Sequence, residues 1–546
     1  MRTVLFLCMF AGTLFFLLTP ATGAGGQPEP IEDRLRPGEI GSPMPKTAPE
    51  ELQSGGNVAV SIKPDDMPTV LIRAIKFEGT DVPESVADAT RAFIARTLSR
   101  AALEELAAAM TAAYERSNVA LFTIVIPEQN FEDGAVRVLV AEGHVGGVSL
   151  IGEAEKRKHM AVIAYAERLT REKPLSRKTL ERRLSLIRDI PGLETSPSFA
   201  YGAEPGGVEL LLALDYQKST VTGGFSNRSS RFVKDGQLNA EGKIYRLLRD
   251  GDFTSLKLAA AANFKDSRYA GLQHTTPVGS NGARADFGTA VLRSRPSGTV
   301  IEGDAQLYAA GVSYPVIRSY RQNLSVRAGL DVVNSDNAAF GALIATEQTR
   351  AIGLSSVYSH VWTSRSLKLT AKLKQGLSAL DAEVSDLIGE PEYFKSRIDA
   401  SLTQKLADDI RVTLNAAGQW TDDNLPANER FSIGGATFGR AFSAGLISAD
   451  RGYAFLVEPA WRPLASGPFD KSELYAFADF ADVETFARPG GSDRTYNLGS
   501  YGAGLRAAYK DNGYLELELA HPFIQPTESF DQDWRFSITW RLNIRP

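Results

Sequence analysis

The sequence predicts a transmembrane β-barrel of about 16 antiparallel strands, preceded by two small α+β domains. Three observations support this fold class: an N-terminal export signal, the lack of any later segment apolar enough for a membrane helix, and strict alternation of apolar and charged residues in the C-terminal part. With 546 residues, the chain is too long for a single core. The predicted boundaries are 1–24 for a signal peptide, 25–68 for a linker, 69–145 and 146–216 for the α+β domains, and 217–546 for the barrel.

The N-terminal segment is typical of a secretory signal peptide. Its sequence, MRTVLFLCMFAGTLFFLLTPATGAGG, places an apolar run after Arg2 and small residues before a cleavage point near Ala24. The run is shorter than the roughly 20 residues that span a bilayer, which disfavours the alternative of a retained anchor. Cys8 is the only cysteine, so the mature chain is expected to lack disulfide and thiol chemistry. Residues 25–68 are rich in proline, glycine and glutamate, which predicts an extended linker.

Two successive β-α-α-β-β patterns follow the linker. In the first, the strand VLIRAIKFEG precedes two helical segments, and Ser99 is placed to cap the second helix, whose apolar residues fall on one face. In the second, Ser176 is the expected cap of the helix in LSRKTLERRLSLIRDIPG, and Pro191 and Gly192 end it. The pattern predicts two α+β domains in tandem.

Beyond residue 216, side chains alternate between apolar and polar with the period of a β-strand. The pattern is clearest in NLSVRAGLDVV, SLKLTAKLK, YLELEL and WRFSITWRL. A soluble β-sandwich would alternate in the same way, but the export signal and the large number of strands favour a barrel. A lipid-facing cation near the midplane costs about 2–4 kcal/mol, so Lys368, Lys372, Arg535 and Arg541 are expected to face a polar lumen.

The sequence shows no pattern of an enzyme, a metal centre or a nucleic-acid-binding protein. The net charge of −5 argues against a partner whose phosphates must be neutralised. The five histidines are scattered without ligand spacing, so neither a metal nor a cofactor is expected. The GAGLRA segment at 502–507 fits a dinucleotide fingerprint only formally, because no helix is expected after it.

Taken together, this order of segments resembles the TpsB transporters of two-partner secretion, within the BamA-like superfamily. Residues 123–153 are similar to a segment of the family's first POTRA domain, and residues 175–214 to one of the second. The resemblance covers nearly the whole mature chain. The positions that carry it in the POTRA domains are Pro127, Gln129, Gly134, Glu142, Gly143, Asp189, Pro191 and Gly192.

A glycine-rich stretch in the barrel region resembles the family's loop that folds back into the pore. RFSIGGATFGRAF and ADRGYAFLVEP match the loop and the strand that leaves it, and the loop is expected near 434–452. The matching residues are Gly434, Gly435, Arg440, Phe442, Asp450, Arg451 and Gly452. The resemblance implies that the arginine pairs with an aspartate of the wall, which predicts an Arg440–Asp479 ion pair. Ala441, Ala481 and the non-aromatic C-terminus depart from the family pattern.

The family implies an outer-membrane transporter of a Gram-negative bacterium with its POTRA domains in the periplasm. These domains would recognise an unfolded partner, a secreted TpsA-like exoprotein, by adding its extended chain to a sheet edge. The client would then pass through the barrel pore to the cell surface. Outer-membrane lipid and the barrel-assembly machinery are the other expected partners. The alternatives are a BamA/TamA-like barrel-assembly factor and a passive porin or adhesin with POTRA modules. A plugging helix is expected near 29–39, where prolines limit it to about two turns.

Overall fold

The protein forms two compact units. The computed structural model describes residues 55–60, 70–131, 133–151, 159–202, 206–230, 233, 235–340, 342–464, 466–510, 512–527 and 533–544. The expected signal peptide, the expected plugging helix and most of the expected linker lie outside the described residues. One unit contains residues 217–316 and 321–546, and the other contains residues 45–216 and 317–320.

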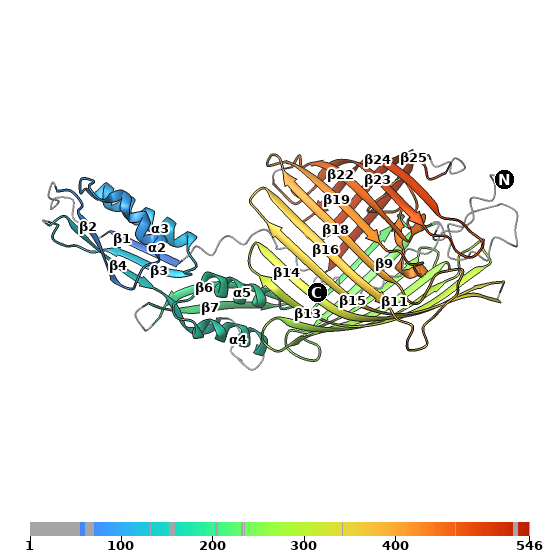
Figure 1. The fold of residues 1–546 in the computed structure, drawn as a ribbon, viewed down its shortest axis with the longest axis horizontal. Coiled ribbons are helices and arrows are strands. Elements are labelled where there is room, and N and C mark those ends of the chain that lie inside the picture. The colour runs from blue at the N-terminus through green and yellow to red at the C-terminus, as the bar shows by residue number, and fades with distance from the viewer. Residues whose placement is uncertain are drawn as a thin grey trace. The chain divides into compact units, whose positions relative to one another are not determined.

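The first α+β domain is a four-stranded sheet with helices packed on one face (Figure 1). The strand order is β1 (Gly55–Val60), β3 (Leu121–Ile126), β4 (Ala135–Glu142) and β2 (Ala74–Gly79). The helices are α2 (Glu84–Thr90), the short η3 (Arg91–Phe93) and α3 (Arg100–Arg116). Ser99 caps α3, because its Oγ accepts a hydrogen bond from the Ala102 N–H at 3.1 Å, as predicted. Leu103, Leu106 and Tyr114 of α3 are fully buried against the sheet.

Strand β1 corrects the predicted boundary between the linker and this domain. Its six residues pair in parallel with β3, from Gly55 opposite Leu121 to Val60 opposite Ile126. Val60 packs against the domain core. The composition of 25–68 argued against regular structure, but pairing at the edge of a formed sheet needs only a short extended segment with free backbone groups. The domain therefore includes residues before 69.

The second α+β domain has a three-stranded sheet in the order β5 (His144–Ile151), β7 (Gly207–Tyr216) and β6 (Leu193–Tyr201). Its helices are α4 (Met160–Ala166), η5 (Glu167–Arg171) and α5 (Arg177–Arg188). Ser176 caps α5 as predicted, with its Oγ 3.2 Å from the Thr179 N. Because β5 begins at His144, this domain starts two residues before the predicted boundary at 146. None of the helices in the described ranges has the length and apolar character needed to cross a membrane.

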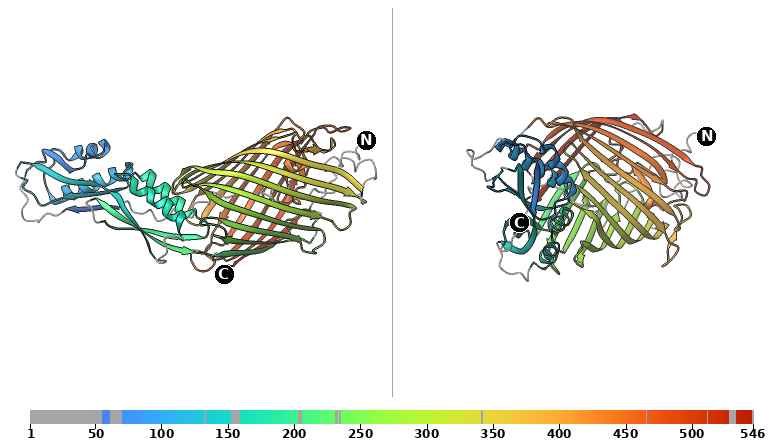
Figure 2. Two further views of the ribbon diagram at one scale, coloured as in Figure 1. Left: turned by 90° about the horizontal axis from the view of Figure 1, so that it is seen from below. Right: turned by 60° about the vertical axis from the view of Figure 1, so that its left-hand side comes forward.

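Sixteen strands close into an antiparallel barrel, as the sequence predicted, and Figure 2 shows their common tilt. The first half of the wall comprises β8 (Ser219–Ser226), β9 (Gln237–Tyr245), β10 (Phe253–Ala261), β11 (Ser267–Val278), β12 (Ala283–Ser294), β13 (Ile301–Arg318), β14 (Gln322–Ala339) and β15 (Ala342–Val361). The second half comprises β16 (Arg365–Gly376), β18 (Phe394–Lys405), β19 (Ile410–Trp420), β22 (Arg451–Trp461), β23 (Glu473–Thr485), β24 (Arg494–Tyr509), β25 (Gly513–Ile524) and β26 (Arg535–Ile544). The two-residue β17 (Glu383–Val384) adds to β15, while β16 pairs directly with β18. Pairing of β26 with β8 closes the circle.

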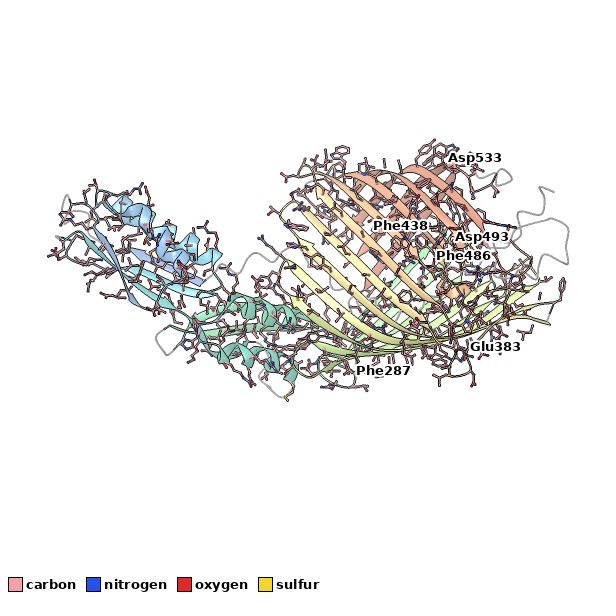
Figure 3. The ribbon with its side chains drawn as sticks, viewed as in Figure 1. Phe287, Glu383, Phe438, Phe486, Asp493 and Asp533 are labelled. Carbon is pink, nitrogen blue, oxygen red and sulfur yellow. The ribbon has the colours of Figure 1, made fainter. Side chains whose placement is uncertain are left out.

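Alternation along the strands separates an apolar outer surface from a charged lumen. On β12, Asp286 is 0% exposed and pairs with Arg327 at 2.6 Å, whereas the next residue, Phe287, is 55% exposed on the outside (Figure 3). The Lys374 Nζ lies 2.6 Å from the Glu429 Oε1, and Glu429 belongs to the segment between β19 and β22 that the barrel encloses. Lys368 and Lys372 share the side of β16 that Lys374 occupies, because side chains alternate along a strand.

The two predicted lumen arginines of β26 also face inward. The Arg535 Nη1 lies 3.2 Å from the Ser443 Oγ of the enclosed segment. The Arg541 guanidinium lies over the ring of Tyr514 at 5.3 Å, and Tyr514 donates a hydrogen bond to the lumen residue Glu516. These contacts place both arginines of β26 on the lumen side, as expected.

A pair of neighbouring substitutions on β15 tests which side of the wall meets lipid. Leu354 is 51% exposed on the outer side, so Leu354→Glu should lower the free energy of unfolding from lipid vesicles by about 2 kcal/mol. Ser355 lies on the lumen side, opposite Arg327 on β14 and Lys372 on β16, so Ser355→Glu should be neutral or stabilising. Urea unfolding of both variants measures the contrast, and equal destabilisation would contradict the assignment.

Candidate functional site: the lumen loop and the barrel wall

The loop between β19 and β22 folds into the barrel and packs against its inner wall. It contains η6 (Ala427–Glu429) and a hairpin of β20 (Phe431–Ile433) and β21 (Ile447–Ala449). Phe438, labelled within the barrel in Figure 3, and Phe442 belong to one buried cluster with Phe477 and Leu498 of the wall. The sequence placed this loop near 434–452; in the structure residues 434–450 lie in the loop, and Arg451 and Gly452 begin the wall strand β22.

Glycines allow the loop to turn where a side chain would not fit. Gly434 and Gly435 have φ values of 106° and 107°, in the region that favours glycine. A Cβ on Gly434 would also overlap the Ser443 carbonyl oxygen. The paired glycines therefore let the chain at Gly434 and Gly435 pack closely against Ser443 and Ala444 on the returning side of the loop.

The Arg440 side chain is held by two glutamates of the wall. Its Nη1 lies 2.8 Å from Glu458 on β22 and 3.2 Å from Glu518 on β25. The guanidinium also stacks over the ring of Phe477 at 4.6 Å, and its Nε donates to the Ala436 carbonyl at 3.1 Å. The predicted side-chain ion pair between Arg440 and Asp479 is therefore wrong in its partner, because the guanidinium is paired with two carboxylates, on β22 and β25.

Asp479 nevertheless holds the same loop tip, through backbone groups. Its carboxylate accepts the Gly439 N–H at 3.0 Å and the Arg440 N–H at 3.1 Å. The Ser500 hydroxyl lies 2.8 and 2.7 Å from the two carboxylate oxygens, next to a register shift between β24 and β25. Asp479 faces the lumen, as alternation along β23 predicted, and its three donors satisfy a carboxylate that is only 3% exposed.

Arg440 belongs to a larger network of opposite charges on the inner wall. Arg506 lies at its centre, 2.6 Å from Glu458, 2.9 Å from Glu473 and 3.1 Å from Glu516. Among the described residues, the network joins Arg228, Arg411, Arg440, Arg462 and Arg506 to Glu458, Glu473, Glu516 and Glu518. The alternation in YLELEL was the one sequence signal for Glu516 and Glu518, but it could not indicate their partners.

Asp450 attaches the loop where it returns to the wall. Asp450 accepts the Leu425 and Phe486 N–H groups at 3.0 and 2.8 Å, and both of its oxygens lie 2.8 Å from the Arg488 guanidinium. Phe486 is labelled in Figure 3. Sequence reasoning identified Asp450 but missed Arg488, which belongs to a different loop and follows no motif.

The next two residues of that motif attach to the adjacent strand. Arg451 pairs with Glu484 of β23 at 2.8 Å. Gly452 has a φ of 150°, and a Cβ there would lie 2.5 Å from the Asp482 carbonyl oxygen. These contacts fix the start of β22 against β23.

Most motif residues of the first POTRA-like domain stabilise its fold. The Gln129 side chain donates to the carbonyls of Pro127 and Arg137 and accepts the Arg137 N–H at 2.7 Å, which fastens the loop to β4. Gly134 has a φ of 68°, and Gly143 donates its N–H to the Leu121 carbonyl at 2.8 Å. Glu142 accepts a hydrogen bond from the buried Tyr114 hydroxyl at 3.3 Å, and burial raises the pKa of both groups.

The motif of the second domain forms the end of α5. Asp189 is the C-cap residue, and Pro191 precedes Gly192, whose φ of 73° turns the chain into β6. Within the same compact unit, both carboxylate oxygens of Asp189 lie 2.6 Å from the Arg318 guanidinium. These residues hold the elements of the domain together.

No group of three or more potential metal ligands gathers anywhere in the described ranges.

Two family models and a known transporter match this sequence. The family model described as haemolysin secretion/activation protein ShlB/FhaC/HecB matches residues 217–507, and the model described as POTRA domain, ShlB-type, matches residues 70–143. The heme/hemopexin transporter protein HuxB of Haemophilus influenzae is 21% identical over 464 residues, which cover 81% of each chain.

Solved structures share the fold. CdiB from Escherichia coli aligns with a TM-score of 0.69 at 17% identity, covering 88% of this chain and 91% of that chain. CdiB from Acinetobacter baumannii gives a TM-score of 0.60 at 18% identity, with coverage of 89% and 91%. BamA from Haemophilus ducreyi lacking POTRA domains 1–3 gives 0.54 at 13% identity, covering 87% of this chain and 100% of that chain.

Double-mutant cycles distinguish the two anchors of the loop tip. Arg440→Gln and Glu518→Gln remove partners of one ion pair, so their effects on the free energy of unfolding should be coupled by about 0.5–3 kcal/mol. Asp479→Asn removes a carboxylate that binds the backbone of residue 440, whereas the guanidinium of that residue pairs with other carboxylates, so its coupling with Arg440→Gln should be weaker than that of the first cycle. Asp482→Asn, on the outer side of β23, is the matched control. Strong coupling in the second cycle alone would restore the ion pair predicted from the sequence.

Glu142 gives the first α+β domain a defined pH dependence. The pKa of Glu142 is raised in the folded state. Its contribution to stability is therefore fully present below the pKa that this group has in the unfolded chain, and it is lost as the pH rises through the pKa that it has in the folded chain. Glu142→Gln keeps an acceptor for Tyr114 without the charge. The stability of this variant relative to wild type should therefore increase as the pH rises from about 4 through the raised pKa of Glu142. Urea denaturation across that range measures it, and a difference independent of pH would refute the interpretation.

Proposed function

This chain belongs to the haemolysin secretion/activation protein family ShlB/FhaC/HecB, and we propose from that premise that it exports an unfolded partner protein through its barrel. It is a transporter of the TpsB type whose barrel lies in the outer membrane and whose POTRA domains lie in the periplasm. The proposal assigns it a secreted TpsA-like client and no enzymatic role. The observation that carries it is a polar lumen occupied by a loop that polar contacts hold in place.

The contacts of the loop are of a kind that water can replace. Arg440 of the loop and the wall residues Glu458 and Glu518 face the lumen, where each group can be hydrated once the loop moves. The apolar contacts of Phe438 and Phe442 oppose that movement. A passage that is closed at rest and opens for a client needs this balance of attachment and reversibility.

The POTRA sheets offer a way to bind an extended client. Strand β1 already adds to the β3 edge of the first domain through six paired residues, so this sheet edge accepts an extended segment. The opposite edge of the same sheet is β2. Strand addition uses backbone hydrogen bonds and therefore tolerates varied client sequences. No nucleotide is required in this mechanism, because folding of the client outside the cell can favour its exit.

An assembly factor for other barrels is the second candidate within the superfamily. The likeness to BamA supports the shared fold and does not by itself assign that activity. Two POTRA domains are fewer than such factors usually carry, which favours secretion. The barrel-assembly machinery then enters only as the partner that inserts this chain into the membrane.

Deleting the gene should remove one large protein from the culture medium, and the full chain supplied in trans should restore it. Protein gels of the medium, with outer-membrane fractions run alongside, measure the effect. Loss of several barrels from the membrane fraction would indicate an assembly factor instead. An unchanged medium, together with a steadily open channel in planar bilayers, would indicate a porin and overturn the proposal.

A further inference from the structure

A column of aromatic residues lies on the outer side of β15 near one end of the barrel. Ile352 and Leu354 are 49% and 51% exposed on this side, and Tyr358 and His360 continue the same alternation. The turn after β15 lies at the barrel end where the chain enters β8 from β7, because β8 to β15 run alternately up and down. This end faces the periplasm, so the column lies at the periplasmic rim of the lipid-facing wall.

The members of the column contact one another in sequence. The Gln322 Nε2 donates to the Tyr358 hydroxyl at 3.1 Å, and this hydroxyl lies 3.2 Å from the His360 Nδ1. The His360 and Trp362 rings stack at 3.9 Å with an interplanar angle of 4°. The Arg365 guanidinium carbon lies 4.3 Å from the centre of the Trp362 ring. The column, defined as Tyr358, His360, Trp362 and Arg365, therefore ends in a cation stacked on an indole.

Arg365 differs from the arginines of the lumen network in how its charge is balanced. Among the residues that the structure describes, no carboxylate lies within salt-bridge distance of Arg365, which is exposed. A guanidinium that stacks on an aromatic face keeps its N–H groups in its own plane, where they can donate to an oxyanion.

We propose that this column binds the phosphate group of a phospholipid in the periplasmic leaflet of the outer membrane. The rings of Tyr358 and Trp362 contact the interfacial part of the lipid, where amphipathic aromatic side chains are favoured. Arg365 donates to the phosphate oxygens, in the planar geometry that arginine offers to phosphate. Basic patches at this depth attract anionic headgroups. The site is independent of client export, since it lies on the opposite side of the wall from the loop.

Native mass spectrometry of the full-length protein, released from micelles containing phosphatidylglycerol, tests the site. Wild type should retain the lipid, and Arg365→Gln should bind it about fivefold more weakly, as expected for one arginine near a membrane surface. Arg365→Lys should lie between the two, because it keeps the charge and loses the planar stack. Lys405→Gln is the control for a cation at the neighbouring periplasmic turn that lies outside the column: Gln404 is the residue opposite Arg365, and Lys405 has its own partner, Asp408, at 2.7 Å.

Each outcome decides for or against the proposal. Equal retention by wild type and Arg365→Gln overturns it, and so does an equal loss in Arg365→Gln and Lys405→Gln, which indicates unspecific attraction by the rim. Displacement of the lipid by excess inorganic phosphate would show that the column binds a free anion, and would also overturn the lipid assignment. Heat-dependent mobility on gels confirms that every variant is a folded barrel.

Discussion

The closure of the barrel is the constraint on which the rest of the structure depends. Lipid offers no hydrogen-bond partners, so the edges of the sheet must pair with each other. Strands β26 and β8 do so from Thr539 opposite Ser226 to Ile544 opposite Val221. Once the sheet is closed, every second side chain must face the lumen. Closure therefore forces the charges of the strands into one enclosed space, where they must neutralise each other.

This enclosed charge explains why the loop tip has two separate anchors. Outside bulk water, the Arg440 guanidinium needs carboxylates, and Glu458 and Glu518 supply them. The turn before it, with Gly439 at a φ of 69°, directs two successive backbone N–H groups at Asp479. Successive N–H groups of this kind form a concave site for an anion. Asp479 thus fixes the path of the loop, while the guanidinium joins the loop to the charge network.

The sequence predicts the features that repeat with a fixed period and misses those that depend on tertiary contacts. Alternation along single strands was sufficient for the barrel and for the inward direction of Asp479, and local capping rules were sufficient for Ser99 and Ser176. The partner of Arg440 could not be predicted, because Glu458 and Glu518 come from strands whose register is fixed only by closure. Strand β1 was missed because its pairing depends on the edge of β3 and on little in its own composition.

The arginines of this chain show how one residue type serves opposite purposes on the two sides of a wall. In the lumen, Arg506 pairs with three glutamates and stacks on Tyr475 at 3.8 Å. These glutamates neutralise its charge. On the outside, Arg365 stacks on Trp362 at a similar distance of 4.3 Å, and within the described ranges no carboxylate pairs with it. Aromatic stacking is common to both and does not distinguish them. The presence or absence of carboxylates distinguishes the two arginines. An arginine that pairs with no carboxylate keeps its N–H donors available for an anion from outside the protein.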